Sequence, residues 1–372
     1  MIFSVPGKCE IGGNHTDHQQ GRVLASAIQL DSIGIVGKQN RYVKVIYNEL
    51  NINEIDTENI KYNEAKKGTM ESLINGVLFG LNQKNYHIGG FNAYIQCDIP
   101  RNVGLGSSAN FNIMIGTIIN YLYNEGKIEN KYLVQIGRFA TNIFYCKPSG
   151  LMNECVCCVG GFIKVDFRDP NSPDIYKLNT DFSNFDYTLC CVNSNVCRSD
   201  NTIDYDAIPK EMIKVANFFK KDVLRDVSYD EFMKNYRIVR ARVGDRPALR
   251  ALHFFKEEDR VLKQTEALEK GDFDTFLKLV RESGDSTFKA LQNIYPQEST
   301  RHQNIGTAIV LSENFLGEDG VVKVNGGGFS STMIAFVKTS VINDYAAYMD
   351  SIFGKGSCYI IHTREQGAIR LL

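Results

Sequence analysis

The sequence predicts an α+β protein built from two domains. Strand-like and helical runs are mixed in the first half of the 372 residues, whereas the pattern from about residue 207 is helical until strand signals return near the C-terminus. A chain of this length exceeds one average core, and its 43% hydrophobic content is enough to fill two. The composition changes near residues 180–205, where we place the domain boundary.

In the first half, alternation of apolar and polar residues predicts strands, and helical periodicity predicts the segments between them. The expected strands are residues 32–39, 41–48, 90–99, 160–167 and 187–194. The expected helices are residues 70–83, 109–124 and 131–146. The run ECVCCVGGFIKVDF is assigned to buried strand, so its cysteines are expected to pack as small hydrophobic residues.

The second half is expected to be a helical block followed by three strands. The expected helices are residues 208–224, 229–243, 250–271 and 274–294. The expected strands are residues 320–327, 331–338 and 356–363. The sequence has no internal repeat and no low-complexity tract, so both halves are expected to fold as ordinary globular units.

Charge and cysteine usage limit the function classes. Lys and Arg number 42 against 43 Asp and Glu, a balance that gives no general attraction to nucleic acid or to an anionic membrane. Neither a signal peptide nor a run of 18 apolar residues is recognised, so a cytoplasmic location is expected. The ten cysteines suit reduced thiols, and the C-x-x-C pair Cys155 and Cys158 lacks the further ligands of a zinc site.

The stretch PRNVGLGSSANFN, residues 100–112, opens an apolar helix with glycines and serines. Such a turn leaves backbone N–H groups unpaired at the positive end of a helix, a combination that attracts phosphate. A P-loop is excluded because the stretch contains no lysine. An ordinary capped core helix is the alternative.

Two further stretches suit ligand contact better than a core. Residues 5–22, VPGKCEIGGNHTDHQQGR, place two histidines, an aspartate and several glycines in one segment that suits a polyhydroxylated ligand. Residues 322–337 contain three consecutive glycines, Gly326, Gly327 and Gly328, between two strands. Positive φ angles or a close approach to a ligand explain such a run.

These stretches, in this order, resemble the motifs of the GHMP kinase superfamily and, within it, of galactokinases. The galactokinase signature G-R-x-N-x-I-G-E-H-T-D-Y-x-x-G resembles GKCEIGGNHTDHQQG at residues 7–21. The motif P-x-x-x-G-L-x-S-S-A matches residues 100–109, and NGGGFSST at residues 325–332 resembles the third, glycine-rich motif. KPSGLMNE at residues 147–154 resembles the galactokinase segment P-C-G-x-M-D-Q.

The resemblance implies an N-terminal domain like the second domain of ribosomal protein S5, over residues 1–185, and a ferredoxin-like C-terminal domain over residues 186–372. It implies a transferase of carbohydrate metabolism that uses ATP and Mg²⁺ to phosphorylate the anomeric hydroxyl of galactose or a related hexose, bound between the domains. The implied nucleotide-binding residues are Gly104, Leu105, Gly106, Ser107, Ser108 and Ala109, with Ser108 also a weak Mg²⁺ ligand. The implied sugar-binding residues are Asn14, His15, Asp17, Gly327 and Gly328.

The sequence departs from the family at the positions that carry the chemistry. Asn153 stands where the family has its catalytic aspartate, and a neutral amide accepts no proton at neutral pH. Thr141 stands where the magnesium-binding glutamate is expected, and Lys8 replaces an arginine. Lys8 keeps the positive charge but loses the planar fork that clamps a phosphate at two points.

Two hypotheses remain open. The first is a galactokinase-like pseudokinase that binds ATP, hexose or both, holds Mg²⁺ weakly and transfers phosphate poorly or not at all. It would serve as a sensor or as a regulatory partner for another protein. The second is an active sugar-1-kinase with a rebuilt site, in which Lys8, Ser108 and Glu154 have catalytic roles and Glu154 replaces the lost base. Adjacent side chains on a helix diverge by about 100°, so Glu154 is not expected to point where Asn153 points. A bare scaffold without nucleotide binding is a third, weaker alternative, which the intact glycine-serine run disfavours.

Overall fold

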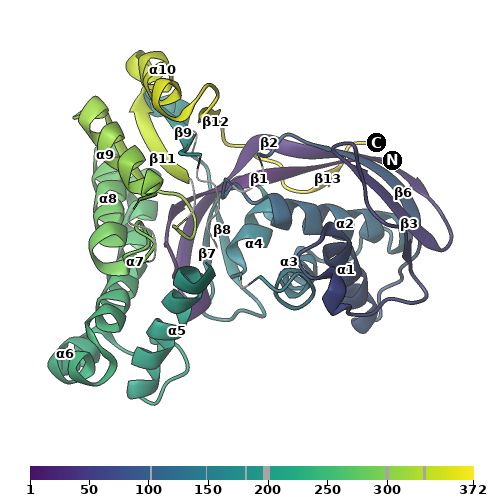
Figure 1. The fold of residues 1–372 in the computed structure, drawn as a ribbon, viewed down its shortest axis with the longest axis horizontal. Helices are drawn as coiled ribbons and strands as arrows, with labels where there is room; N and C mark the ends of the chain where they lie inside the picture. The colour runs from purple at the N-terminus through teal and green to yellow at the C-terminus, as the bar shows by residue number, and fades with distance from the viewer. Residues whose placement is uncertain (101–102, 148, 181, 196–201, 298–300, 330–331) are drawn as a thin grey trace.

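The computed structural model shows two β-sheets, each packed against helices (Figure 1). It describes residues 1–100, 103–147, 149–180, 182–195, 202–297, 301–329 and 332–372. Parts of three motif stretches lie outside the described residues, namely Arg101, Asn102, Pro148, Ser330 and Ser331. The predicted α+β class is confirmed, with helices and mainly antiparallel sheet in both halves of the chain; the pair β3–β6 is parallel.

The larger sheet contains nine strands. Along its main path the order is β13-β1-β2-β6-β3-β4, while β7 pairs with β2 and β8, and β5 pairs with β3. The strands are β1 (Ile2–Gly12), β2 (Arg22–Lys38), β3 (Tyr42–Tyr47), β4 (Leu50–Asn51), β5 (Ile55–Asp56), β6 (Phe91–Cys97), β7 (Phe162–Asp166), β8 (Asp174–Leu178) and β13 (Ile369–Arg370). Buried and exposed residues alternate strictly along β6, as expected for a sheet with one open face.

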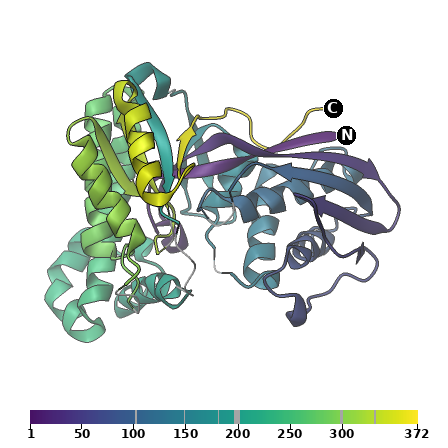
Figure 2. The same cartoon turned by 45° about the horizontal axis from the view of Figure 1, so that its top comes forward.

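Four helices cover one face of this sheet (Figures 1 and 2). They are α1 (Met70–Gln83), α2 (Ser107–Tyr123), α3 (Asn130–Phe139) and α4 (Met152–Val159). Helix α1 begins where the side chain of Thr69 accepts a hydrogen bond from the backbone N–H of Ser72, and it buries Ile74, Leu78 and Leu81 at helical spacing. A π-helical turn, Ala140–Phe144, continues α3.

The smaller sheet has the order β10-β11-β9-β12 and is antiparallel throughout. Its strands are β9 (Tyr187–Asn193), β10 (Gly320–Val324), β11 (Thr332–Lys338) and β12 (Cys358–Ile361). The helices of this half are α5 (Thr202–Phe218), α6 (Tyr229–Val243), α7 (Asp245–Glu269), α8 (Phe273–Ser286), α9 (Asn304–Leu316) and α10 (Ile342–Phe353). Ion pairs join the two halves, because Glu258 of α7 meets Arg22 of β2 and Arg225 meets Asp166 of β7.

Three assignments made from the sequence are wrong. The last three strands were expected to follow the helices without interruption, but helix α10 (Ile342–Phe353) lies between β11 and β12. Residues 2–12 form the long strand β1, although the sequence pattern predicted no strand there and assigned residues 5–22 to ligand contact. The cysteines of ECVCC lie in helix α4 rather than in a strand. A short apolar run is buried on every side in either structure, so periodicity alone does not separate the two. The helix ends at Gly160, whose φ of +74° favours glycine.

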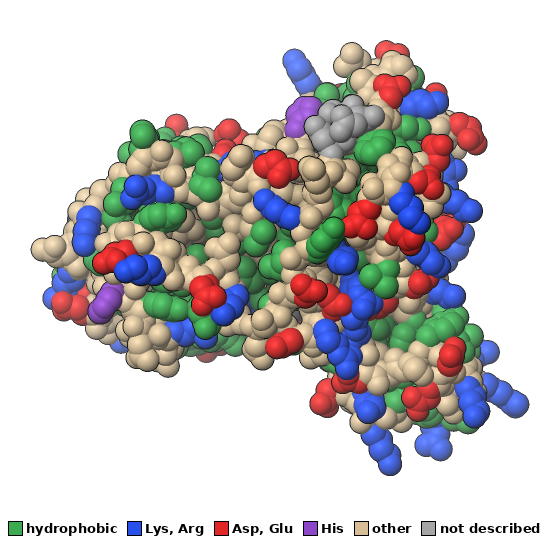
Figure 3. Space-filling model, turned by 180° about the vertical axis from the view of Figure 1, so that it is seen from behind, with side chains coloured by type: hydrophobic (Ala, Val, Ile, Leu, Met, Phe, Trp, Pro, Cys, Tyr) green, Lys and Arg blue, Asp and Glu red, His purple; other side chains and the backbone are tan. Residues whose placement is uncertain are grey.

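The two ends of the chain lie together. Phe3 of β1 pairs with Arg370 of β13, so the last strand joins the larger sheet beside the first (Figure 1). On the face shown in Figure 3, acidic and basic side chains are interspersed. None of the helices in the described ranges is long and apolar enough to cross a membrane.

Candidate functional site

The glycine-serine turn before α2 lies directly against β1. The backbone N–H of Lys8 donates to the carbonyl of Leu105 at 3.0 Å. Gly104 and Gly106 have φ of +69° and +85°, which explains the two glycines. Gly106 is the N-cap of α2 and offers no side-chain acceptor to the first turn. The open N–H groups of that turn therefore suit a phosphate.

Lys8 lies between two glycine segments. A Cβ placed on Gly106 would lie 2.8 Å from Lys8 Cγ, and a Cβ placed on Gly326 would lie 3.8 Å from Lys8 Nζ. The Lys8 side chain is buried, at 3% exposure, yet no described residue accepts a hydrogen bond from its ammonium group. A buried cation without a protein acceptor suits an anionic ligand at this point.

The third motif packs against the signature loop, residues 12–17. His15 Nε2 lies 2.8 Å from the carbonyl of Gly327, and Asn14 Nδ2 donates to the carbonyl of Gly326. Gly326 and Gly328 have φ of +66° and +70°, as expected from the run of glycines. A Cβ on Gly327 would overlap the ring of Tyr205 of α5, at 2.1 Å from Cε2. Two motifs far apart in the chain thus form one site.

Asn14, predicted to bind sugar, has its side chain engaged within the protein. It is fully buried, its Nδ2 donates to Glu10 Oε1 at 2.6 Å, and its Oδ1 accepts from Asn293 Nδ2 at 2.8 Å. Its carbonyl lies 2.9 Å from His253 Nε2 of α7. The structure therefore places Asn14 as the residue that holds the loop to its neighbours.

His15 and Asp17 lie at the edge of the same loop. A Cβ placed on Gly150 would lie 1.7 Å from Asp17 Oδ2, so the loop contacts the segment that leads into α4. Burial raises the pKa of Asp17, although the neighbouring His15 lowers it. Burial also lowers the pKa of His15, which favours a neutral ring that can donate from one nitrogen and accept at the other.

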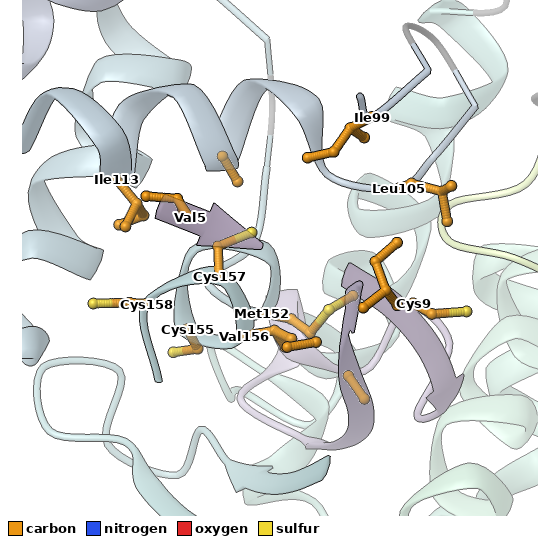
Figure 4. Packing of buried hydrophobic residues seen from close by; sticks show 14 of the residues in the cluster. Val5, Cys9, Ile99, Leu105, Ile113, Met152, Cys155, Val156, Cys157 and Cys158 are labelled. Atoms are coloured by element: carbon orange, nitrogen blue, oxygen red, sulfur yellow. The ribbon is translucent and has the colours of Figure 1, made fainter. Parts of the chain in front are cut away.

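Asn153 is on the side of α4 that faces the glycine-serine turn. It precedes Cys157 by one helical turn, and residues four apart share a helix face. Cys157 Sγ would lie 3.7 Å from a Cβ on Gly106, and Figure 4 shows Cys157 beside β1 while Cys155 and Cys158 point elsewhere. Asn153 Oδ1 is buried and has no hydrogen-bond partner among the described residues.

Glu154 points into the layer of helices instead. A Cβ on Gly137 would lie 3.0 Å from Glu154 Cγ, and Thr141 Oγ1 donates to Glu154 Oε1 at 3.3 Å. Asn112 Nδ2 in turn donates to Thr141 Oγ1 at 2.8 Å. The divergence expected for neighbours on a helix places Glu154 beside Thr141, the position where the family has an acid. Burial raises the pKa of Glu154 to about 7.

The substitution Glu154→Gln should stabilise the protein at pH 8 and have little effect at pH 5. The pKa of Glu154 is raised from 4.5 to about 7, so the folded chain keeps a proton that the unfolded chain loses between these values. This contribution to stability is complete below pH 4.5 and is lost as the pH rises through about 7. The difference amounts to about 3 kcal/mol.

Thermal unfolding of both proteins at pH 5 and pH 8 measures this effect, with the exposed Glu318→Gln as control. The melting temperature of Glu154→Gln should exceed that of the unmodified chain only at pH 8. An equal difference at both pH values would show that Glu154 does not titrate in this range.

The structure shows which side chains lie at the positions predicted for Mg²⁺. Ser108 and Asn112 share one face of α2, and Asn112 contacts Thr141. Asn112 therefore lies between Ser108 and Thr141, the two positions predicted for the metal. Thr141 has no charge. Glu154 Oε2 is buried without a partner among the described residues, and it is the carboxylate oxygen at this point that a cation could use. The described part of the chain contains no cluster of three or more His, Cys, Asp or Glu suited to a metal.

The sequence pattern does not indicate two residues that lie at this site. Glu10 lies on the same face of β1 as Lys8, because side chains two apart on a strand point the same way. Assigning residues 2–12 to a strand would have found it. Tyr205 comes from α5 and its ring centroid lies 5.4 Å from that of His15. No local signal predicts that long-range contact.

Comparison with known proteins shows which families two segments of the chain resemble. Residues 72–161 match the model of the GHMP kinases N terminal domain, and residues 1–38 match the galactokinase galactose-binding signature. In these two segments the chain resembles GHMP kinases and, within that superfamily, galactokinases. The resemblance predicted from the motifs is confirmed, and the signature match includes β1 and the whole signature loop.

Solved structures confirm the GHMP kinase fold over the whole chain. Galactokinase of Lactococcus lactis, solved in complex with galactose, is 20% identical, with a TM-score of 0.84 over 100% of this chain and 95% of that one. Mevalonate kinase of Methanococcus jannaschii is 16% identical, with a TM-score of 0.67 over 98% of each chain. A D-glycero-D-manno-heptose 1-phosphate kinase from Bacteroides thetaiotaomicron is 12% identical, with a TM-score of 0.64 over 100% of both chains.

Proposed function

We propose that this galactokinase-like protein binds ATP and a hexose where the signature loop meets the glycine-serine turn, and that its sugar-1-phosphotransferase activity is impaired or lost. The observation that supports the loss is Asn153. It lies on the face of α4 toward the turn, where the family has an aspartate, and its buried Oδ1 belongs to a neutral amide. Losing a general base costs about 10²–10⁴ in rate.

Support for ATP binding comes from the turn and from Lys8. The first turn of α2 begins at Gly106 without a side-chain cap, and the ammonium group of Lys8 has no acceptor among the described residues. Unpaired N–H groups and a buried cation stabilise the negative charge of phosphates. Mg²⁺ would be held by Ser108, and Glu154 is the acid that could assist. Because Thr141 supplies no charge, we propose that the metal binds weakly.

Support for hexose binding comes from the signature match and from the loop itself. The match to the galactose-binding signature covers residues 1–38. His15 and Asp17 are half-buried or buried polar groups at the edge of the loop, beside Gly150 and the ring of Tyr205. We further propose that the hexose lies between domains 1–185 and 186–372 and that the protein acts in the cytoplasm. A regulatory protein partner is part of the same proposal.

One observation favours an active kinase as the second candidate. The carboxyl of Glu154 has a pKa raised to about 7 and an unpartnered Oε2, properties that suit a group accepting a proton near neutral pH. Its contact with Thr141 places an acid next to a position where the family has one. The orientation of Glu154 toward Gly137, away from the turn, favours the first candidate.

Calorimetric titration with ATP and with D-galactose, each in the presence and absence of Mg²⁺, tests the proposed binding. We expect heat of binding for both ligands and a weak dependence of ATP affinity on Mg²⁺. A coupled assay of ADP release, with an active galactokinase as positive control, should show little sugar-dependent turnover. Absence of ATP binding at millimolar concentration would contradict the proposal, as would fast turnover of a hexose.

A further inference from the structure

Glu10 has a buried carboxylate to which no role has been assigned. It is 4% exposed and lies on the face of β1 that also presents Lys8. One described donor reaches it, because Asn14 Nδ2 donates to Oε1 at 2.6 Å, and no described residue donates to Oε2. In the described part of the chain, no lysine, arginine or histidine forms an ion pair with it.

The buried carboxylate of Glu10 needs more hydrogen-bond donors than the described residues supply. An ionised carboxylate has about four lone-pair sites and is costly to bury unless they are used. The charge of Glu10 acts on His15 and Asp17. It opposes the lowering of the pKa of His15 by burial, and it adds to the rise that burial causes in the pKa of Asp17. Glu10 therefore belongs electrostatically to the loop that is predicted to hold the sugar. A ligand with several hydroxyl groups would supply the missing donors.

The sequence supports the same assignment. In the alignment with the signature G-R-x-N-x-I-G-E-H-T-D, asparagine falls at the position of Glu10 and glutamate falls at the position of Asn14. The two residue types have thus changed places, and the side chains that changed places are hydrogen-bonded to each other. The pair keeps one amide and one carboxylate, while the negative charge moves from the loop to strand β1.

We propose that Glu10, and not Asn14, provides the carboxylate that accepts a hydrogen bond from a hexose hydroxyl. Asn14 is a positioning residue: its Nδ2 fixes Glu10 Oε1, which leaves Oε2 for the ligand. The proposal rests on the proposed function, in that a hexose must bind at the signature loop. It names a specificity-determining residue that the loop sequence alone does not reveal.

Calorimetric titration of the full chain with D-galactose tests this assignment. The isosteric variant Glu10→Gln keeps an oxygen for Asn14 but removes the charge. Because hydrogen bonds to a charged acceptor are stronger than neutral ones, its Kd for galactose should rise about tenfold or more. Its Kd for ATP should remain within about twofold, and the exposed Glu318→Gln should leave both constants unchanged.

Exchanging the residue types at positions 10 and 14 provides a second test. Asn14→Glu alone places two carboxylates in contact within the protein, so it should lower the melting temperature and weaken galactose binding. The double variant Glu10→Asn/Asn14→Glu restores one acid and one amide to the pair. It should recover a galactose Kd within about threefold of the unmodified chain, a non-additive result that independent sites would not give.

The outcomes distinguish failure of the Glu10 assignment from failure of the proposed hexose binding. If the unmodified chain binds galactose and Glu10→Gln, still folded by circular dichroism, binds it equally well, the assignment of Glu10 is wrong while the proposed function stands. If the unmodified chain binds ATP but gives no heat with galactose, glucose or N-acetylgalactosamine, the hexose part of the proposed function fails, and this inference fails with it.

Discussion

A variant restored at four positions, Lys8→Arg, Thr141→Glu, Asn153→Asp and Glu154→Gln, is expected to release ADP with galactose at least about 10²-fold faster than the unmodified chain. Each change returns a residue type that the family motifs have. Asn153→Asp places a carboxylate on the face of α4 toward the glycine-serine turn. Lys8→Arg adds a two-point clamp for phosphate beside Gly106.

The structure shows why positions 141 and 154 must change together. Thr141 Oγ1 lies 3.3 Å from Glu154 Oε1, so Thr141→Glu alone would place two carboxylates in one buried layer. Glu154→Gln removes that repulsion. Asn153→Asp alone should gain little, because a proton acceptor is of small use while the metal and the phosphoryl group are poorly held. Residues that act as a unit are strongly non-additive.

Steady-state ADP release from the single, paired and fourfold variants measures this effect, with circular dichroism to confirm folding. The gain of the fourfold variant should exceed the product of the four separate gains. A fourfold variant that folds and binds both ligands, yet is no faster than the unmodified chain, would show that activity is lost for a reason outside these four positions.

Gly106→Val is expected to abolish the rise in melting temperature that ATP produces. Gly106 has a φ of +85°, and a Cβ there would lie 2.8 Å from Lys8 Cγ. The new side chain would displace the one buried cation described beside the turn and crowd the open N–H groups of α2. Left-handed backbone costs an L-residue about 1–2 kcal/mol, so some loss of stability is also expected.

Gly271→Val separates the two effects. Gly271 has a φ of +70°, and a Cβ there would meet nothing within 4 Å. This control should lose a similar amount of stability to backbone strain but keep the full ATP-induced shift. Differential scanning fluorimetry with and without millimolar ATP measures both quantities. A shift that survives in Gly106→Val would mean that ATP does not bind at this turn.

The local parts of this site could be predicted from the sequence. Gly104, Gly106, Gly326 and Gly328 have positive φ angles, as their motifs indicated. Glu154 diverges from Asn153 as two neighbours on a helix must. Motif order also indicated the GHMP kinase fold. These features depend on a few consecutive residues, whose chemistry is visible in the sequence.

The remaining features depend on contacts between distant segments. Asn14 was expected to face a sugar, but its side chain is engaged by Glu10, Gly326 and Asn293, two of which are about 280 to 310 positions away. The strand that brings Glu10 beside Lys8 was not predicted, because residues 5–22 were treated as one segment whose glycines and histidines suit ligand contact. Helix α4 was missed because a short apolar segment has no distinguishing period.

Formation of the sugar phosphate by the unmodified chain is the most direct test of the central claim, that ligand binding persists while phosphoryl transfer is impaired. The protein is incubated with ATP, Mg²⁺ and D-galactose, and the phosphate on the anomeric oxygen is followed by ³¹P nuclear magnetic resonance. We expect both ligands to bind and the product to form more slowly than about 0.1 s⁻¹. Turnover at about 1 s⁻¹ or faster that is abolished in Glu154→Gln would contradict the claim and identify Glu154 as the base.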